Sequence, residues 1–117
     1  MKTLFILNDP PYGSERGYNA LRLAHALMKA EPEGTVTVFL MADAIVSARK
    51  GQKTPDGYYN MERMLKRVII GKGRVLICGT CMDARGMTDE DIIDGAARST
   101  MPELAEETIS ADKVLVF

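Results

Sequence analysis

The sequence predicts an α/β fold in which helices cover both faces of a mostly parallel sheet. Three observations predict it: short apolar runs alternate with segments of helical period, each apolar run is nearly continuous, and turn or capping residues separate the segments. Continuous apolar runs are typical of strands buried on both faces, as in parallel sheets. With 117 residues the chain has the length of one domain, so we treat residues 1–117 as a single domain.

The first half of the chain predicts two strands that flank a helix, followed by a long loop. Apolar residues recur at helical spacing between two apolar runs, and prolines and glycines mark the turns. The expected elements are a strand at residues 2–7, a helix from a cap at Ser14 to near Pro32, a strand at 36–41, a short helical stretch at 42–48 and a loop at 49–59. This order is typical of a βαβ unit.

The second half repeats the alternation and ends in a strand. The expected elements are a helix from a cap at Asn60 to Gly71, a strand at 74–77 that continues into Cys78, a short helix from Thr88 through Ile93, a last helix capped by Thr100 and a strand at 113–117. Both threonine caps have an acidic residue three positions later, which is capping-box spacing. Four strands are therefore predicted, and the periodicity of residues 96–99 does not decide whether they form a fifth.

Composition and charge exclude several classes of protein. Hydrophobic residues make up 46% of the chain and charged residues 26%, so we expect a folded domain rather than a disordered one. Fifteen basic and sixteen acidic residues are interleaved, which argues against nucleic acid as a partner. No apolar run approaches the roughly 20 residues that span a bilayer, and the N-terminus has no export-signal pattern. We expect a cytoplasmic protein without a membrane partner.

The strongest local signal is the motif Cys-Gly-Thr-Cys at residues 78–81, placed where a predicted strand ends. Functional groups gather at the carboxyl ends of strands in open α/β sheets, because the loops there vary while the sheet holds their bases. Cys78 and Cys81 are the only thiols, and without an export signal we expect both to be reduced. A zinc site needs four ligands, and only His25 and scattered carboxylates remain, so we predict no metal and no cofactor.

Three interpretations of the two cysteines stay open. A sulfur carrier needs one reactive thiolate, which a cation or a helix N-terminus favours; Arg85 and the helix near Thr88 are the candidates. A dithiol oxidoreductase uses both thiols, but its motif normally opens a helix, whereas here helix signals resume only at Thr88. Alternatively, Cys78 ends a buried strand as a small apolar residue and Cys81 is incidental.

Other polar positions have structural interpretations. We interpret Asp43 as the cap of the helical stretch after the second strand rather than as a site carboxylate. His25 lies one residue off an apolar helix face, which favours a surface or interface position. Tyr58 and Tyr59 end the long loop and favour a subunit contact. Methionines on the helix faces are expected to fill the core, namely Met28, Met61, Met64 and Met101.

Several spaced motifs in a single order extend over nearly the whole chain. They are Pro11-Tyr12-Gly13-Ser14-Glu15, Leu21-Arg22-Leu23-Ala24, Phe39-Leu40-Met41-Ala42-Asp43-Ala44, Arg49-Lys50-Gly51-Gln52-Lys53 before Gly57-Tyr58, Cys78-Gly79-Thr80-Cys81, Arg85-Gly86, Ile93-Asp94-Gly95 and Ser110-Ala111-Asp112-Lys113-Val114-Leu115. On these motifs the sequence resembles the DsrE/DsrF-like family of sulfur-relay proteins, and within it the small YchN-like proteins.

The resemblance implies a three-layer α/β/α domain with a parallel sheet of about five strands, flavodoxin-like in appearance, that assembles into homo-oligomers such as trimers or hexamers. In relay members one cysteine carries sulfur as a persulfide, and an Arg-Gly pair follows at the spacing seen here from Cys78 to Arg85 and Gly86. Sulfur donor and acceptor proteins are the implied partners. Cys81 is shared with the YchN-like members but not with the better-understood relay members, so its role stays open: it resolves the persulfide or forms a disulfide with Cys78.

We therefore predict a cytoplasmic, homo-oligomeric sulfur carrier or sulfurtransferase that accepts and transfers sulfane sulfur on Cys78. Cys81 and Arg85 complete the predicted site. The alternatives are a non-catalytic homo-oligomeric module that binds a small molecule or a protein, and a dithiol oxidoreductase that uses both cysteines.

Overall fold

The chain folds into a five-stranded parallel sheet with helices on both faces, in a computed structural model that describes residues 1–117. The strands are β1 (Lys2–Leu7), β2 (Thr35–Leu40), β3 (Arg74–Cys78), β4 (Ala96–Ser99) and β5 (Lys113–Val116). The helices are α1 (Arg16–Ala30), α2 (Met61–Ile70), α3 (Gly79–Ala84) and α4 (Met101–Ser110), with short 3₁₀ helices η1 (Ala42–Ala48) and η2 (Asp89–Asp91). The predicted α/β fold class is confirmed. None of the helices combines the length and apolarity needed to cross a bilayer.

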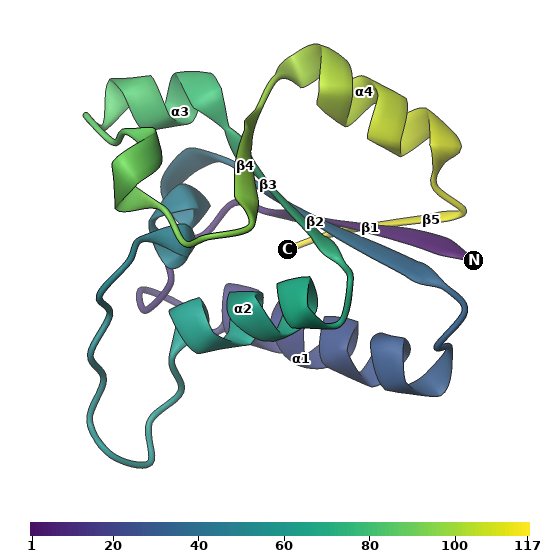
Figure 1. The fold of residues 1–117 in the computed structure, drawn as a ribbon, viewed down its shortest axis with the longest axis horizontal. Coiled ribbons are helices and arrows are strands. Elements are labelled where there is room, and N and C mark those ends of the chain that lie inside the picture. Colours follow the sequence, from purple (N-terminus) through teal and green to yellow (C-terminus); the bar gives the residue numbers. More distant parts are fainter.

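The layers follow from the order of the strands, which is β4-β3-β2-β1-β5. Helices α1 and α2 lie side by side on one face of the sheet, and α4 covers the other face (Figure 1). Strands β1 to β4 are added to the sheet one after another in the same direction. Helix α4 then connects β4 to β5, which pairs with the other edge of β1. Because all strands are parallel, their carboxyl ends meet at one edge, where η1 and α3 begin.

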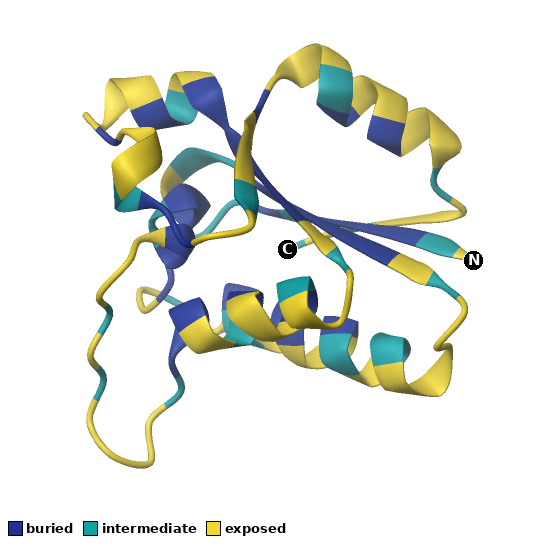
Figure 2. Cartoon of the chain, in the orientation of Figure 1, coloured by how far each residue is buried: buried dark blue, intermediate teal, exposed yellow.

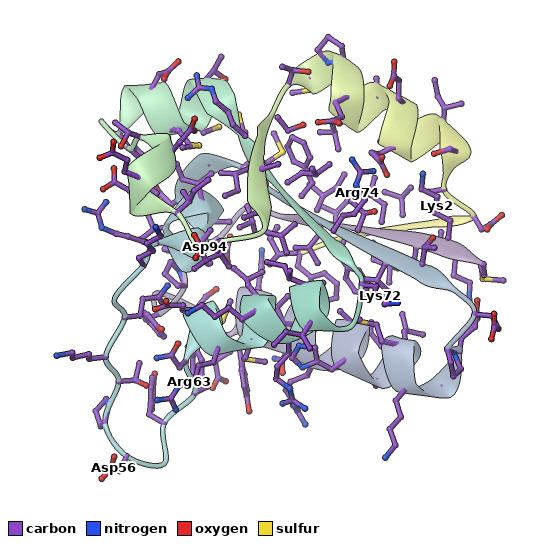
Figure 3. The ribbon with its side chains drawn as sticks, viewed as in Figure 1. Lys2, Asp56, Arg63, Lys72, Arg74 and Asp94 are labelled. Carbon is purple, nitrogen blue, oxygen red and sulfur yellow. The ribbon has the colours of Figure 1, made fainter.

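The register of the sheet places Cys78 on the α4 face. Alternate residues of a strand point to opposite faces, and paired residues of neighbouring strands point the same way. Lys2 of β1 and Arg74 of β3 both form ion pairs with Glu107 of α4, so both point to that face (Figure 3). Cys78 lies four residues after Arg74 in β3 and therefore faces the same way.

Apolar side chains between the sheet and α1 and α2 form the main part of the core, as the strand and helix patterns predict (Figure 2). The α4 face is covered less completely. Met101 is 58% exposed, Ile109 is 86% exposed, and Val116 on the edge strand β5 is 65% exposed. The prediction that Met101 fills the core is therefore wrong, because α4 is the only long helix on this face and nothing covers its outer side. Met61 is fully buried, and Met28 and Met64 pack against the core as predicted.

Three element boundaries differ from the predictions. The sequence predicts no helix between Cys78 and Thr88, yet α3 begins directly after Cys78. The helix expected from Thr88 through Ile93 is the three-residue η2, whose capping box joins Thr88 and Asp91. Helix α1 begins at Arg16 without a side-chain cap, although Ser14 Oγ accepts a hydrogen bond from the Arg16 N–H. The segment that periodicity left undecided is a strand, β4.

The base of the long loop before α2 is fixed by polar side chains. Gln52 Nε2 donates to the Ser47 carbonyl at 2.8 Å, and the Gln52 N–H donates to Glu62 Oε1 at 2.9 Å. Asn60 caps α2 as predicted, because its Oδ1 accepts the Arg63 N–H at 3.1 Å. The loop therefore returns to the fold in a defined position beside η1 and α2.

Candidate functional site

Cys78 is both the last residue of β3 and the N-cap of α3, so its position is fixed by a strand on one side and a helix on the other. Its Sγ accepts a hydrogen bond from the Cys81 N–H at 3.3 Å and lies 3.3 Å from Thr80 Oγ1. Both cysteines are free thiols; Cys78 is 7% exposed and Cys81 is half-buried. The structure thus brings together two of the three predicted site residues in one turn.

The two thiols differ in acidity. Burial raises the pKa of Cys78, but the hydrogen bonds it receives from Cys81 and Thr80 outweigh burial and hold its pKa below the usual range of a cysteine. Burial and the hydrogen bond with Cys78 together raise the pKa of Cys81. The thiolate is the nucleophilic form of cysteine, so Cys78 is the more reactive thiol by charge state.

Gly79 permits a close approach of β4 to the cysteine turn. A Cβ at Gly79 would lie 2.8 Å from Arg98 Nε and 3.1 Å from the Ser99 carbonyl oxygen. Real Cβ contacts are not this short, so any larger residue would displace the Arg98 side chain. The glycine in the motif therefore has a packing role next to Cys78.

Arg98 also belongs to the candidate site, although no pattern in the sequence predicts it. Its Nη2 donates to Asp83 Oδ2 at 2.7 Å, and this ion pair joins β4 to α3. The hydrogen bond with Asp83 and the charge of Cys78 both raise the pKa of Arg98. Arg98 and Cys78 line the same hollow of about 320 Å³. The N-terminal residues of α4 form another wall of this hollow. No motif surrounds Arg98; only the pairing of Cys78 with Ser99 reveals its position.

Arg85 lies on the Cys81 side of the turn. Its Nη1 donates to the Cys81 carbonyl at 3.1 Å, and its Nε and Nη2 donate to Asp43 Oδ1 at 3.0 and 2.8 Å. The prediction that Asp43 caps the stretch after β2 is wrong: Met41 is the N-cap residue of η1, and the Asp43 side chain reaches the arginine instead. The Ala42 N–H also donates to Cys81 Sγ at 3.3 Å, so η1 contacts the second thiol.

The histidine and the loop tyrosines considered in the sequence lie away from the cysteine turn. His25 Nε2 is 2.9 Å from the Met64 carbonyl oxygen, which joins α1 to α2. Tyr58 and Tyr59 lie beside these helices at the end of the long loop. The structure holds no group of three or more His, Cys, Asp or Glu side chains arranged to bind a metal.

Comparison with known proteins gives the chain its family. The model of the DsrE/DsrF-like family matches residues 1–117. This chain belongs to the DsrE/DsrF-like family. Protein YchN of Escherichia coli strain K12 is 43% identical over 116 residues, which cover 99% of this chain and 98% of YchN. The crystal structure of YchN from E. coli matches with a TM-score of 0.95, covering 100% of this chain and 99% of that one.

A more distant relative of the chain has a functional name. Sulfurtransferase TusD of Salmonella typhi is 25% identical over 129 residues, and the match covers 100% of both chains. Together with the family match, this relative supports a sulfur-relay-like family for the chain. The resemblance drawn from the spaced motifs is confirmed at the level of family and fold.

Proposed function

We propose that this protein is a sulfur carrier that accepts sulfane sulfur on Cys78 as a persulfide and transfers it to an acceptor thiol. The observation that carries the proposal is the position of Cys78, which ends β3 and caps the N-terminus of α3 with its Sγ. Cys78 Sγ accepts the Cys81 N–H at 3.3 Å and has the lowered pKa, whereas the pKa of Cys81 is raised. The family match and the name of the sulfurtransferase relative support the same chemistry.

The proposed reaction consists of two thiol exchanges. The Cys78 thiolate attacks the outer sulfur of a donor persulfide, R–S–SH; a bond forms between Cys78 Sγ and that sulfur, the donor S–S bond breaks, and the donor leaves as the thiolate R–S⁻. An acceptor thiolate then attacks the outer sulfur, and Cys78 leaves as a thiolate. The protein is unchanged after both steps, and the sulfane sulfur passes from donor to acceptor without a net oxidant.

The neighbouring groups have distinct roles in this reaction. The Cys81 N–H and the Thr80 hydroxyl stabilise negative charge on Cys78 Sγ, both before attack and when Cys78 leaves. Arg98 supplies positive charge beside Cys78, and the ion pair with Asp83 holds the Arg98 side chain in position. Arg85 holds the Cys81 carbonyl and Asp43, so we assign it to positioning the second thiol.

A dithiol oxidoreductase is the second candidate, and one observation favours it. The motif opens helix α3, with the first cysteine more acidic than the second, which is the arrangement found in dithiol motifs. In this reaction the Cys78 thiolate attacks a substrate disulfide and releases one substrate thiolate. The Cys81 thiolate then attacks Cys78 Sγ and releases the other. The substrate disulfide is reduced, and the Cys78–Cys81 pair is oxidised to a disulfide.

We further propose that the chain acts as a homo-oligomer, with a second copy covering the outer side of α4 and the edge strand β5. Ile109 and Val116 are largely exposed there, and β5 has an unpaired edge. Trimers or hexamers are the assemblies that the family resemblance implies. In the alternative of a non-catalytic binding module, the same assembly forms but the thiols take no part.

Intact-protein mass spectrometry after incubation with a sulfane-sulfur donor tests the proposal. The wild type and Cys81→Ser should gain sulfur, and Cys78→Ser should not. A loss of two hydrogens that requires both cysteines would favour the dithiol reaction. No change in the mass of the folded wild type would favour the binding module.

A further inference from the structure

A second hollow, of about 390 Å³, lies on the outer side of α1 and α2, where the long loop returns to the fold. Figure 3 shows Arg63 where the long loop meets α2. The lining residues come from α1, α2 and the loop: Tyr18, Arg22, His25, Tyr58, Tyr59, Asn60, Arg63, Met64 and Arg67. None of them is acidic, and none lines the hollow beside Cys78, which lies on the opposite face of the sheet.

The arginines of this hollow lack acidic partners. The chain has eight arginines, and five of them form ion pairs with carboxylates, namely Arg16, Arg49, Arg74, Arg85 and Arg98. The other three are Arg22, Arg63 and Arg67, and all three line the hollow. Arg63 and Arg67 are four positions apart on α2, where like charges repel. No carboxylate of the chain offsets this repulsion, so an anion that contacts both guanidinium groups would relieve it.

The tyrosines of the chain gather at the same place. All four pack in one cluster centred on Tyr59, whose ring centroid lies 4.3 Å from that of Tyr18, 4.6 Å from that of Tyr58 and 5.5 Å from that of Tyr12. The Tyr59 hydroxyl donates to the Pro11 carbonyl, which fixes the ring. Tyr58 lies at one end of the stack and is 52% exposed, so its side chain is accessible to a ligand.

Guanidinium groups and stacked aromatic rings recognise different parts of the same class of ligand. Arginine binds phosphate oxygens in a bidentate manner, and tyrosine rings stack on nucleobases. Arg22 lies 5.5 Å over the Tyr18 ring, so the cationic and aromatic groups are already adjacent. A ligand that combines an anionic phosphate with a planar base satisfies both sets of groups at once.

We propose that this hollow binds a free mononucleotide, with its phosphate on Arg63 and Arg67 and its base on Tyr58. The volume of the hollow is within the range of small-molecule sites, roughly 300–1,000 Å³. A long nucleic acid fits less well, because the chain has a net charge of −1 and its other arginines are paired. The site is independent of the proposed sulfur chemistry.

Calorimetric titration of the 117-residue chain with AMP, adenosine and inorganic phosphate tests the proposal. AMP should bind, with adenosine and phosphate each at least about tenfold weaker, because each makes only one of the two sets of contacts. Arg67→Gln should weaken AMP about tenfold, since a hydrogen bond to a charged group is lost. Lys72→Gln is the matched control: it removes one positive charge just past the C-terminal end of α2 (Figure 3), from a residue that does not line the hollow, and should leave AMP binding within about twofold.

Substitutions of the outer tyrosine separate stacking from charge. Tyr58→Ala should weaken AMP about tenfold and leave phosphate unchanged, and Tyr58→Phe should bind AMP as the wild type does. Cys78→Ser should retain AMP binding, so that failure of this proposal and failure of the sulfur chemistry are distinguishable. The proposal is overturned if AMP does not bind at millimolar concentration, if Lys72→Gln and Arg67→Gln weaken it equally, or if a single-stranded oligonucleotide binds and AMP does not.

Discussion

The Cys81 N–H donates a hydrogen bond to Cys78 Sγ at 3.3 Å, so the second cysteine stabilises the thiolate of the first through its backbone. This contact exists because α3 begins at Gly79, which turns the amides of the motif toward the end of β3. A backbone donor is retained when the Cys81 side chain is changed. The acidity of Cys78 is therefore separable by mutation from the chemistry of the Cys81 thiol.

The two thiols should react at different pH values. The pKa of Cys78 is lowered and that of Cys81 is raised, so alkylation of Cys78 by iodoacetamide should increase at lower pH than alkylation of Cys81. Peptide mapping by mass spectrometry after short pulses across a pH series measures both. In denaturant the two profiles should converge near the ordinary cysteine pKa, about 8.5. Coincident profiles in the native protein would contradict the assigned acidities.

The two arginines near the motif should have different effects on Cys78. The charge of Arg98 interacts with Cys78, whereas that of Arg85 acts on Cys81. Arg98→Ala should slow alkylation of Cys78 severalfold, because the thiolate loses a nearby positive charge. Arg85→Ala, its matched control, should leave that rate within about twofold. The pulse-alkylation assay measures both rates. A larger effect of Arg85→Ala than of Arg98→Ala would contradict this account and show that Arg85 is the arginine that stabilises the Cys78 thiolate.

Glu107 should make the stability of the protein sensitive to acid. Burial raises the pKa of Glu107, but Lys2 and Arg74 outweigh burial and hold its pKa below the usual range. A carboxylate with a lowered pKa adds stability above its unfolded pKa, and this stability is lost as the pH falls through its folded pKa. Glu107→Gln should lower the free energy of unfolding near neutral pH by about 1–3 kcal/mol. This loss is smaller than that expected on breaking a fully buried ion pair, because Arg74 is half exposed.

Urea denaturation near neutral pH and from about pH 5 to 3 measures this effect. The stability of Glu107→Gln should fall less steeply with acid than that of the wild type. Glu106→Gln is the control, because Glu106 is an exposed neighbour with no ion pair. An equal loss of stability in both variants would show that Glu107 has no special role.

The exposed side of α4 should control assembly. Ile109→Asp places a charge on the face proposed to meet a second copy, so it should reduce the molar mass measured by light scattering to that of a smaller species. Ile70→Asp, at an equally exposed isoleucine of α2, should leave the assembly unchanged. A monomeric wild type, or dissociation by Ile70→Asp alone, would contradict the proposed interface.

Elements with local signals could be predicted from the sequence. The caps Asn60 and Thr100 and the apolar periods after them predict α2 and α4, because capping and periodicity act within a few residues. Helix α3 could not be predicted in this way. It has six residues, and its N-cap is Cys78, whose capping role depends on a thiol rather than on a usual capping side chain.

The missed site residues depend on contacts between distant segments. Asp43 stands at a plausible cap position, but its partner Arg85 is 42 residues away. Arg98 reaches Cys78 only because β4 pairs with β3, and the sequence does not give the order of the strands. The sequence predicts the apolar face of α4 and places Met101 of this face in the core, but Met101 is 58% exposed because no other element of the chain covers the outer side of α4.

Isotope-labelled sulfane sulfur shows directly whether Cys78 carries sulfur from a donor to an acceptor. The wild type is loaded from a labelled persulfide donor, freed of donor, digested and mapped before and after addition of an acceptor thiol. The label should be found as a persulfide on the peptide that contains Cys78, and it should move to the acceptor thiol once that thiol is added. Cys81→Ser should still take up the label, whereas Cys78→Ser should not. Label uptake by folded Cys78→Ser, or label on Cys78 that no thiol removes, would contradict sulfur transfer through Cys78.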